Sequence, residues 1–249
     1  MKEIRVAPHV HSEWSYDAEW PLPELVAAFR ERKYDAVLTA EHDRGFDDSR
    51  WDGYREACAA ASTDELVVVP GMEYEDAESL VHVPVWGEGI PFLGAARPTA
   101  ELLRDAKAGG AFTVFAHPAR RNASAAFDSG WTPLLDAIEV WNRHYDGIAP
   151  YPGGRALAAE QSLRPFVALD FHTRRQFFPL AMVLEVEEPV TTATVVEALR
   201  AGRFRTEAFG ADALRLSGGV AGGTLLAAER VRKLVRRPVR RAQRAFGRD

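Results

Sequence analysis

The feature that most constrains the fold is the alternation of short apolar runs with segments of helical period along the 249 residues. The apolar runs are rich in Val, Ile, Phe and Leu, and they predict strands at residues 4–6, 36–39, 66–69, 81–86, 112–115, 137–140, 165–169 and 181–186. Strands that alternate with helices are typical of parallel β/α units. Seven or eight strands in about 220 residues favour a closed barrel, although an open sheet fits the same pattern.

Three of the intervening segments carry signals for the start and the end of a helix. The first opens at Pro23, and the second is expected to be capped by Thr99 and to end at Gly109. The third starts at one of the threonines in residues 191–194 and stops at Gly202. Proline and threonine at the start and glycine at the end are ordinary helix boundaries.

The composition excludes two classes of small protein. A single cysteine, Cys58, excludes a disulfide framework and a Cys-x-x-Cys zinc site. The opening MKEIRVAPHVHSEW lacks the apolar segment of a signal peptide, and no run approaches the roughly 18 apolar residues of a membrane span. The expected compartment is therefore the cytoplasm.

Charge is distributed unevenly along the chain. The net charge is −5, but nine basic and two acidic residues give positions 229–249 a charge of +7, so the remainder carries −12. The basic residues of this segment are Arg230, Arg232, Lys233, Arg236, Arg237, Arg240, Arg241, Arg244 and Arg248. Apolar residues follow a helical period among them, and Pro238 is expected to kink or split the helix.

These shifts in composition predict three parts: a barrel domain at 1–216, a glycine-rich linker at 217–223 and a basic amphipathic tail at 224–249. Such a tail can lie on an anionic membrane surface, contact nucleic acid or pack on the acidic body of its own chain. A membrane role would make the protein peripherally membrane-associated. The sequence leaves these alternatives open.

Histidines and carboxylates lie inside or directly after the predicted strands. The residues concerned are His9, His11, His42, Glu73, His82, His117, Asp170 and His172. In a parallel β/α barrel the carboxyl ends of the strands meet on one face, so these side chains are expected to converge. Imidazole and carboxylate groups supply the lone pairs that divalent cations require. A single histidine at a strand end more often has a packing role, but the repeated coincidence favours a metal site.

The same residues occur in motifs that resemble those of a known family. The motifs are HVHSEWSYD with His9, His11 and Asp17, AEHD with His42, GMEYE with Glu73, AHP with His117 and DFH with Asp170 and His172. In this order they resemble the polymerase-and-histidinol-phosphatase (PHP) superfamily of metal-dependent phosphoesterases. The resemblance implies an α/β fold, a distorted (β/α)7 barrel, with two or three divalent ions such as Zn, Mn or Fe.

The resemblance also implies three sets of metal ligands. One ion would be held by His9, His11, Glu73 and Asp170. A second would be held by Glu73, His82 and His117, with Glu73 as the bridge. A third would be held by Asp17, His42 and His172. The remaining histidine, His144, is expected to have a loop role.

Three positions depart from the family pattern. Ala7 stands where many members have an aspartate, and Glu41 replaces the aspartate that usually precedes His42. Both positions are expected behind the ligands, where they affect the choice and affinity of the metal. Asp17 occupies a position that is histidine in some relatives, which predicts a weaker third site.

The expected reaction is hydrolysis of a phosphate mono- or diester of a small molecule, nucleotide or oligonucleotide. Asp170, Glu73 and His172 are the expected catalytic residues, with a metal-bridging hydroxide near Asp170 and Glu73 as the nucleophile. Arginine binds phosphate oxygens through paired donors. The arginines expected to bind the substrate are Arg120, Arg121, Arg174 and Arg175.

Two other functions fit parts of the pattern. An amidohydrolase-like or PHP-like hydrolase of a non-phosphate ester, amide or carbamate would also begin with His-x-His and end with an aspartate after a strand. Lys107 lies in a predicted helix, so it is poorly placed to form the carbamate bridge of such an enzyme. A non-catalytic metal-binding module is the second alternative, although its expected mark would be the loss of ligands.

Overall fold

The strands form two six-stranded mixed sheets in a computed structural model that describes residues 1–245, with side chains to residue 235. The first sheet has the order β12-β11-β10-β1-β2-β4. Its strands are β1 (Lys2–Val10), β2 (Ala36–Thr39), β4 (Val67–Val69), β10 (Leu180–Val186), β11 (Phe204–Ala208) and β12 (Ala211–Asp212). The second has the order β3-β5-β6-β7-β8-β9. Its strands are β3 (Glu41–His42), β5 (Gly71–Glu75), β6 (His82–Trp86), β7 (Phe112–Phe115), β8 (Ala137–Asn142) and β9 (Arg164–Ala168).

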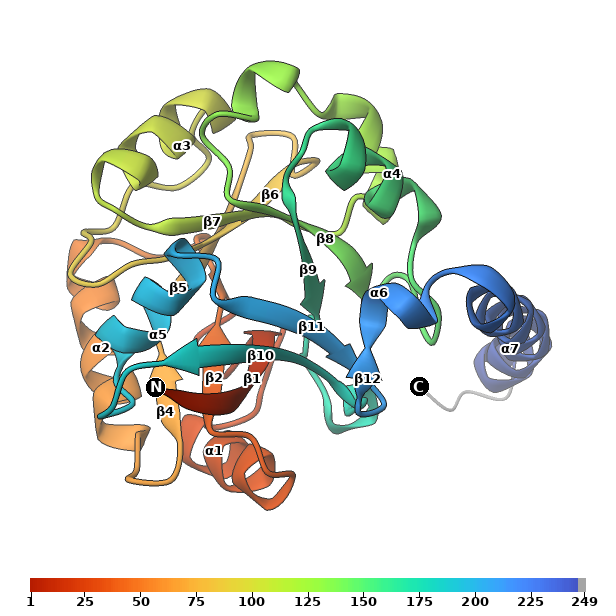
Figure 1. Cartoon of the computed structure of the whole chain (residues 1–249), viewed down its shortest axis with the longest axis horizontal. Coiled ribbons are helices and arrows are strands. Elements are labelled where there is room, and N and C mark those ends of the chain that lie inside the picture. The colour runs from red at the N-terminus through yellow and green to blue at the C-terminus, as the bar shows by residue number, and fades with distance from the viewer. Residues whose placement is uncertain (246–249) are drawn as a thin grey trace.

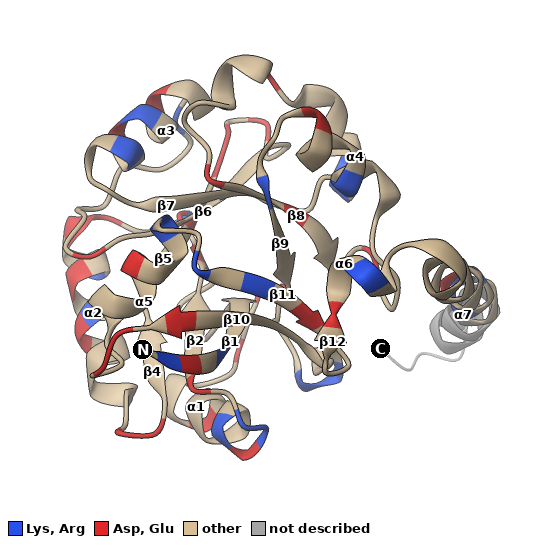
Figure 2. Cartoon of the chain, viewed as in Figure 1, with Lys and Arg blue, Asp and Glu red and all other residues tan. Residues whose placement is uncertain are grey.

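Helices cover the outside of these strands. They are α1 (Leu22–Glu31), α2 (Asp48–Ala61), α3 (Thr99–Ala108), α4 (Pro152–Glu160) and α5 (Thr192–Arg200). Figure 1 shows α1, α2, α3 and α4 around the periphery, and Figure 2 shows that charged residues lie mostly on the outer helices and the loops. The buried hydrophobic side chains of both sheets form one continuous core.

The two sheets meet at two places. Strands β2 and β3 are separated by one residue, as are β4 and β5, so the chain passes directly from one sheet into the other. On the opposite side, the His11 amide donates to the Phe171 carbonyl at 2.9 Å and the Phe171 amide donates to the His9 carbonyl at 3.2 Å. These bonds bring the end of β1 beside the end of β9. Closure into a (β/α)7 barrel stays a prediction, because the strand ladders group into two sheets.

The strand pairing corrects one expectation from the sequence. All eight predicted segments contain strands, but the sheets are mixed rather than parallel, because β6 runs antiparallel to β5 and β7, and β10 runs antiparallel to β1 and β11. Only residues 76–81 connect β5 to β6, which is too short for the crossover that parallel strands need. The sequence pattern also missed four strands, β3, β5, β11 and β12. Strands β3 and β12 are very short, and the apolar residues of β5 and β11 are interrupted by polar side chains.

Most helix boundaries agree with the predicted signals. Helix α5 begins after Thr191, whose hydroxyl accepts from the Thr194 amide in a reciprocal cap. Helix α3 ends at Gly109 as expected, but Thr99 is its first residue rather than its cap, and Pro98 precedes it.

The C-terminal segment differs from its predicted organisation. Residues 219–223, expected in a linker, form the start of a long helix, α7 (Gly219–Ala245), which follows the short α6 (Ala213–Leu216). The helix continues through Pro238, where a break was expected. Side chains from Arg236 onward, and all of residues 246–249, lie outside the described part of the structure. Among the described residues, no helix has the length and apolarity to cross a membrane.

Candidate metal centre

The predicted ligands converge at one end of the strands, around the carboxylate of Glu73. Five imidazoles lie within 3.5 Å of its two oxygens. Those nearest Oε1 are His117 Nε2 at 2.9 Å, His82 Nδ1 at 3.1 Å and His9 Nε2 at 3.4 Å. Those nearest Oε2 are His42 Nδ1 at 3.2 Å and His11 Nε2 at 3.5 Å. Glu73 is thus a buried carboxylate shared by many nitrogen donors, as a bridging metal ligand must be.

Asp170 lies on the other side of the His9–His11 pair. Its Oδ1 is 3.6 Å from His11 Nε2, 4.0 Å from His9 Nε2 and 3.4 Å from His172 Nδ1. We call the fully buried residues around Glu73 and Asp170 the inner group. It consists of His9, His11, Glu73, His82, His117 and Asp170.

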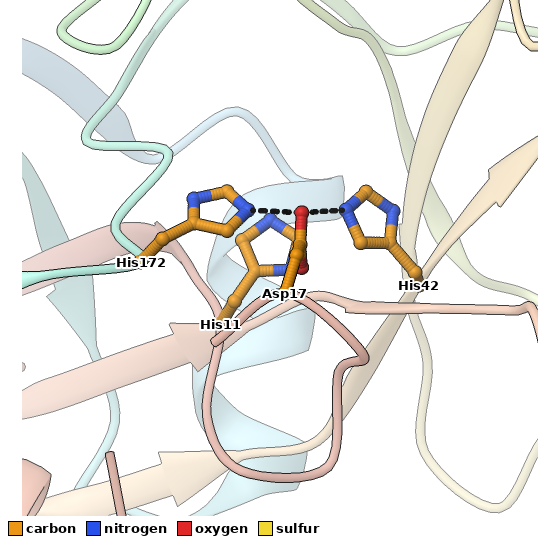
Figure 3. Close-up of side chains that lie close together, drawn as sticks. All are labelled: His11, Asp17, His42 and His172. Carbon is orange, nitrogen blue, oxygen red and sulfur yellow. Dashed lines mark ion pairs between the residues drawn. The ribbon is translucent and has the colours of Figure 1, made fainter. Parts of the chain in front are cut away.

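The remaining predicted ligands form an outer group of Asp17, His42 and His172. Asp17 Oδ2 lies 3.4 Å from His42 Nε2 and 3.3 Å from His172 Nε2, as Figure 3 shows. His11 completes a set of four ligand atoms that all lie within 4.8 Å of one another. His42 lies between the groups, because its Nδ1 faces Glu73 and its Nε2 faces Asp17.

Three residues of the inner group have an unusual backbone. His9, His117 and Asp170 have positive φ angles of 58°, 29° and 48°. This region is rarely adopted by residues other than glycine, and such strain is concentrated at functional sites. Each residue lies near the end of a strand, where the side chains of His9 and His117 reach Glu73 and that of Asp170 reaches His9 and His11.

A glycine allows β5 to carry Glu73 into this position. A Cβ atom on Gly71 would lie 2.3 Å from the Trp86 indole and 2.4 Å from the Thr39 carbonyl oxygen. The Trp86 indole instead donates to this carbonyl oxygen at 2.7 Å. Any larger side chain at position 71 would therefore displace β5, and Glu73 with it.

Glu139 on β8 supports the inner group from behind. It accepts from His9 Nδ1 and from the His117 amide, both at 2.7 Å, and from Asn142 Nδ2 at 2.8 Å. Asn142 Nδ2 also lies 3.2 Å from Asp170 Oδ2. Because His9 donates through Nδ1, its Nε2 retains the lone pair on the side of Glu73. The sequence analysis missed this role, and its only signal was an acidic residue inside the apolar run AIEVW.

Glu41 and Ser15 fix the orientation of His11 in a similar way. The Ser15 hydroxyl donates to Glu41 Oε2 at 2.5 Å, so its oxygen is left to accept from His11 Nδ1 at 3.1 Å. This arrangement again leaves the Nε2 lone pair facing the carboxylates. Glu41 is fully buried and also accepts from the amide and hydroxyl of Ser12. The position behind the ligands that was predicted for Glu41 is the one it occupies.

The charge states suit metal ligation. Burial raises the pKa of Glu73, but the surrounding imidazoles, His9 first, outweigh it and hold the pKa well below its usual range. Burial lowers the pKa of His11 and His117. Burial also lowers the pKa of His42, but Glu73 and Asp17 more than offset this and raise it to about 9. The ionised Glu73 and the imidazoles of His11 and His117 are thus in the form that binds a divalent cation. His9 and His42, whose pKa values are raised by the neighbouring carboxylates, would instead release a proton when a cation binds.

Two buried nitrogen atoms provide a direct test of fit. Among the described residues, the Nδ1 atoms of His42 and His82 are buried without a hydrogen-bond partner, although each lies within 3.2 Å of a Glu73 oxygen. These two nitrogens and the Glu73 oxygen form a cluster of ligand atoms within 4.8 Å of one another. A cation is the species that nitrogen and oxygen donors can share without hydrogen bonds, so the residues present fit a metal ion.

The four predicted phosphate-binding arginines separate into two pairs. Arg120 donates to the Ser79 carbonyl at 2.6 Å and to the Tyr145 hydroxyl at 3.2 Å, and Arg121 donates to the same carbonyl at 3.0 Å. These contacts hold the loop between β5 and β6. Arg174 and Arg175 are exposed near the outer group.

Arg174 lines a pocket of about 540 Å³ that opens beside the outer group. Its guanidinium lies over the Trp20 ring at 4.6 Å and donates to Glu24 at 3.2 Å. Asp17 and His172 form the side of the pocket that faces the metal ligands. Of the four predicted arginines, Arg174 is therefore the one placed in a pocket next to the centre.

His144 lies closer to the centre than the sequence analysis expected. It follows β8 on a loop, and its Nδ1 is 3.9 Å from Asp170 Oδ1. Its side chain is 40% exposed, and its ring is stacked on Tyr145.

Comparisons with known proteins show a likeness in fold. No family model and no curated protein sequence matches the chain. Among solved structures, a two-domain protein from Bacteroides vulgatus containing a predicted PHP-like metal-dependent phosphoesterase matches 83% of the chain with a TM-score of 0.60 and 18% identity. PsfC from Pseudomonas syringae PB-5123 matches 94% with a TM-score of 0.61 and 16% identity. The lesion-specific endonuclease EndoQ from Pyrococcus furiosus matches 80% with a TM-score of 0.56 and 15% identity.

The extent of these matches differs among the three structures. The match covers 99% of PsfC, but only 65% of the Bacteroides protein and 56% of EndoQ, so the chain spans about two thirds or less of the two larger proteins. The similarity lies in the fold. The chain thus has the fold of solved structures that include one described as containing a predicted PHP-like metal-dependent phosphoesterase, which is the fold that the resemblance in the motifs implied.

Proposed function

We propose that the protein is a metal-dependent phosphoesterase that hydrolyses a phosphate mono- or diester. The observation that carries this proposal is the carboxylate of Glu73, with five imidazoles within 3.5 Å and Asp170 on the far side of His9 and His11. Such a concentration of buried nitrogen and oxygen donors fits divalent cations. A similar fold occurs in a solved structure described as containing a predicted PHP-like metal-dependent phosphoesterase.

Two or three ions fit the donor atoms. In the inner group, His9, His11 and Asp170 would share one ion with Glu73, while His82 and His117 would share a second with it. The outer group would hold the third. Mixed imidazole and carboxylate ligands suit Zn, Mn or Fe. Divalent ions bound there would lower the pKa of a water molecule and neutralise charge on the phosphoryl oxygens.

The chain's own residues would bind and orient the substrate. Arg174 reaches the pocket beside the outer group and offers planar donors to phosphate oxygens. Glu73 and Asp170 would hold the metal ions at the buried strand ends. His172 lies between Asp170 and Asp17, at 3.4 and 3.3 Å, and lines the pocket. It therefore lies where a substrate in the pocket would meet the outer group.

The pocket favours a substrate that presents a compact phosphoryl group. It is bounded by Trp20 and Tyr16 as well as by carboxylates, and its volume of about 540 Å³ suits a small molecule or a short part of a chain. One of the similar structures is described as an endonuclease, so a phosphodiester is one of the substrate classes to be tested. The alternative proposal, a hydrolase of a non-phosphate ester, amide or carbamate, would use the same metal ligands. A non-catalytic metal-binding role would retain metal without turnover.

A substrate panel tests these functions against one another. p-Nitrophenyl phosphate, bis(p-nitrophenyl) phosphate and p-nitrophenyl acetate would be compared for the protein and for its His11→Ala and His172→Ala variants. We expect turnover of a phosphate ester that both variants lose. Arg97→Ala is a matched control, because Arg97 pairs with Asp105 on α3, away from the centre, and should retain activity. Hydrolysis of the acetate alone, or undiminished turnover in both histidine variants, would contradict the proposal.

A further inference from the structure

The helix α7 has two distinct faces along its described part. The residues least exposed to solvent are Gly222, Leu225, Leu226, Glu229 and Arg232, and their spacing places them on one side of a helix. Val220, Ala227, Val231, Leu234 and Val235 follow the same three- and four-residue spacing and are all exposed. These two sets lie on opposite sides, and Figure 1 shows the helix at the edge of the molecule.

A polar anchor holds the inward face on the rest of the chain. Glu229 is 5% exposed and accepts from the Ile148 amide at 3.1 Å. Arg232 donates to both Glu229 oxygens at 2.6 Å. Gly147 lies so close to this pair that a Cβ atom there would be 2.4 Å from Arg232. This anchor fixes which side of α7 faces the body.

The outward face of the described part of α7 is apolar although it faces solvent. Val220, Val231, Leu234 and Val235 are 88%, 59%, 65% and 60% exposed, and together they make up four of the seven large exposed hydrophobic residues among the described side chains. An amphipathic helix on a protein surface ordinarily turns its apolar side toward the core. In α7 Leu225 does pack against the core on the inward side, but the outward side of the described helix carries a second apolar stripe, which is presented to a partner.

We propose that α7 docks the protein on an anionic membrane surface. Its apolar stripe would enter the boundary between headgroups and acyl chains, while the basic residues beside the stripe would contact anionic headgroups. Arg230 is exposed on the described part of the helix, whereas Lys233 lies 3.6 Å from Glu229 on the inward side, and positions 229–249 carry a net charge of +7. The charge thus complements an anionic lipid surface, and the stripe complements its apolar layer.

The same observations disfavour two other occupants. Nucleic acid is bound by basic groups that face the phosphates, whereas the outward face of α7 is aliphatic as far as Val235, where the described side chains end. A second copy of the chain would bring two segments of +7 together, and their repulsion would oppose association. This inference does not depend on the proposed phosphoesterase activity.

Vesicle sedimentation of the full chain tests the proposal. Phosphatidylcholine vesicles would be compared with vesicles that also contain phosphatidylserine, at low and high salt. We expect at least about tenfold tighter binding to the anionic vesicles, reduced by salt. The variant Val231→Gln/Leu234→Gln/Val235→Gln keeps the basic residues and should bind at least about tenfold more weakly.

A matched control separates the stripe from a general effect of added glutamines. Glu56→Gln/Ala59→Gln/Ala60→Gln changes three exposed positions of α2 and should bind vesicles like the unchanged protein. Circular dichroism and thermal unfolding would establish that both variants fold. Equal vesicle binding by the α7 variant and the unchanged protein would overturn the proposal. Loss of a concentration-dependent dimer in the α7 variant, without any vesicle binding, would also overturn it in favour of a second copy of the chain.

Discussion

The inner and outer groups use the same two kinds of side chain but differ in burial and in support. Glu73 and Asp170 are 1% and 2% exposed, whereas the side chain of Asp17 is 36% exposed. The inner ligands come from strand ends and are held by Glu139 and Asn142. Asp17 comes from the loop between β1 and α1 and borders the pocket.

This difference assigns a separate consequence to each group. Two buried carboxylates destabilise the fold unless positive charge lies nearby. Metal ions bound to the inner group would supply this charge, so we expect metal binding to stabilise the fold. The outer group is reached by solvent from the pocket, so an ion there can exchange and meet the substrate. We therefore expect the inner ions to be bound tightly and the outer ion more weakly.

The largest loss is expected from Glu73→Gln. The change preserves size but removes the charge that five imidazoles surround. Changes to groups that merely support metal ligands weaken binding or activity by about 10–100-fold, so removal of this shared ligand should lower kcat/KM by more than about 100-fold. Metal analysis and phosphate-ester turnover measure the effect. Glu75→Gln on the same strand is the control, since Glu75 contacts only His82 within the centre, at 3.5 Å. This change should reduce kcat/KM by less than about tenfold.

Glu139→Gln should have the next largest effect. Glu139 accepts three hydrogen bonds, and an amide in its place would turn a donor toward at least one of these donors. We expect metal affinity to fall by about 10–100-fold, as measured by competition with a chelator. Glu185→Gln, at an exposed position of β10, provides the comparison. Unchanged affinity in Glu139→Gln would show that the inner group does not depend on its support.

Asp17→Ala should affect the outer group alone. Loss of its carboxylate leaves His42 and His172 without the oxygen that lies within 3.4 Å of both. We expect one ion fewer per chain and a decrease in kcat/KM of about tenfold, with the inner ions retained. Asp17→His would supply an imidazole at the same position and should restore the ion. Loss of all the metal in Asp17→Ala would remove the distinction between the groups.

The smallest effect is expected at the exposed rim. The side chain of Arg174 is 72% exposed, so solvent screens its charge. We therefore expect Arg174→Ala to raise KM only about three- to tenfold, with little change in kcat. Arg120→Ala is the matched comparison, because Arg120 holds Ser79. It should lower the free energy of unfolding by about 1 kcal/mol and leave KM unchanged. A raised KM in Arg120→Ala, with KM unchanged in Arg174→Ala, would place the phosphate near Arg120.

Much of the inner group could be predicted from the sequence because its residues follow apolar strands. His9 lies near the end of β1 and His11 directly follows it, and Asp170 follows the run that ends at Leu169, so the strand pattern alone brings them to one face. Glu139 could not be found in this way. It lies inside an apolar strand, and its role is created by contacts with residues more than 20 positions away.

Other parts of the structure depend on distant contacts in the same sense. The antiparallel pairing of β10 with β1 joins residues about 180 positions apart, and no local pattern specifies its direction. Arg120 and Arg174 both follow a predicted ligand, yet one binds a loop carbonyl and the other lines the pocket. The orientation of α7 likewise depends on distant contacts, among them that of Glu229 with Ile148.

Anomalous diffraction from crystals grown with Zn or Mn tests the central claim most directly. We predict strong peaks beside Glu73 and a weaker peak between Asp17 and His172, with the weaker peak absent in Asp17→Ala. A map without a peak in contact with Glu73 would contradict the assignment of these buried histidines and carboxylates as metal ligands.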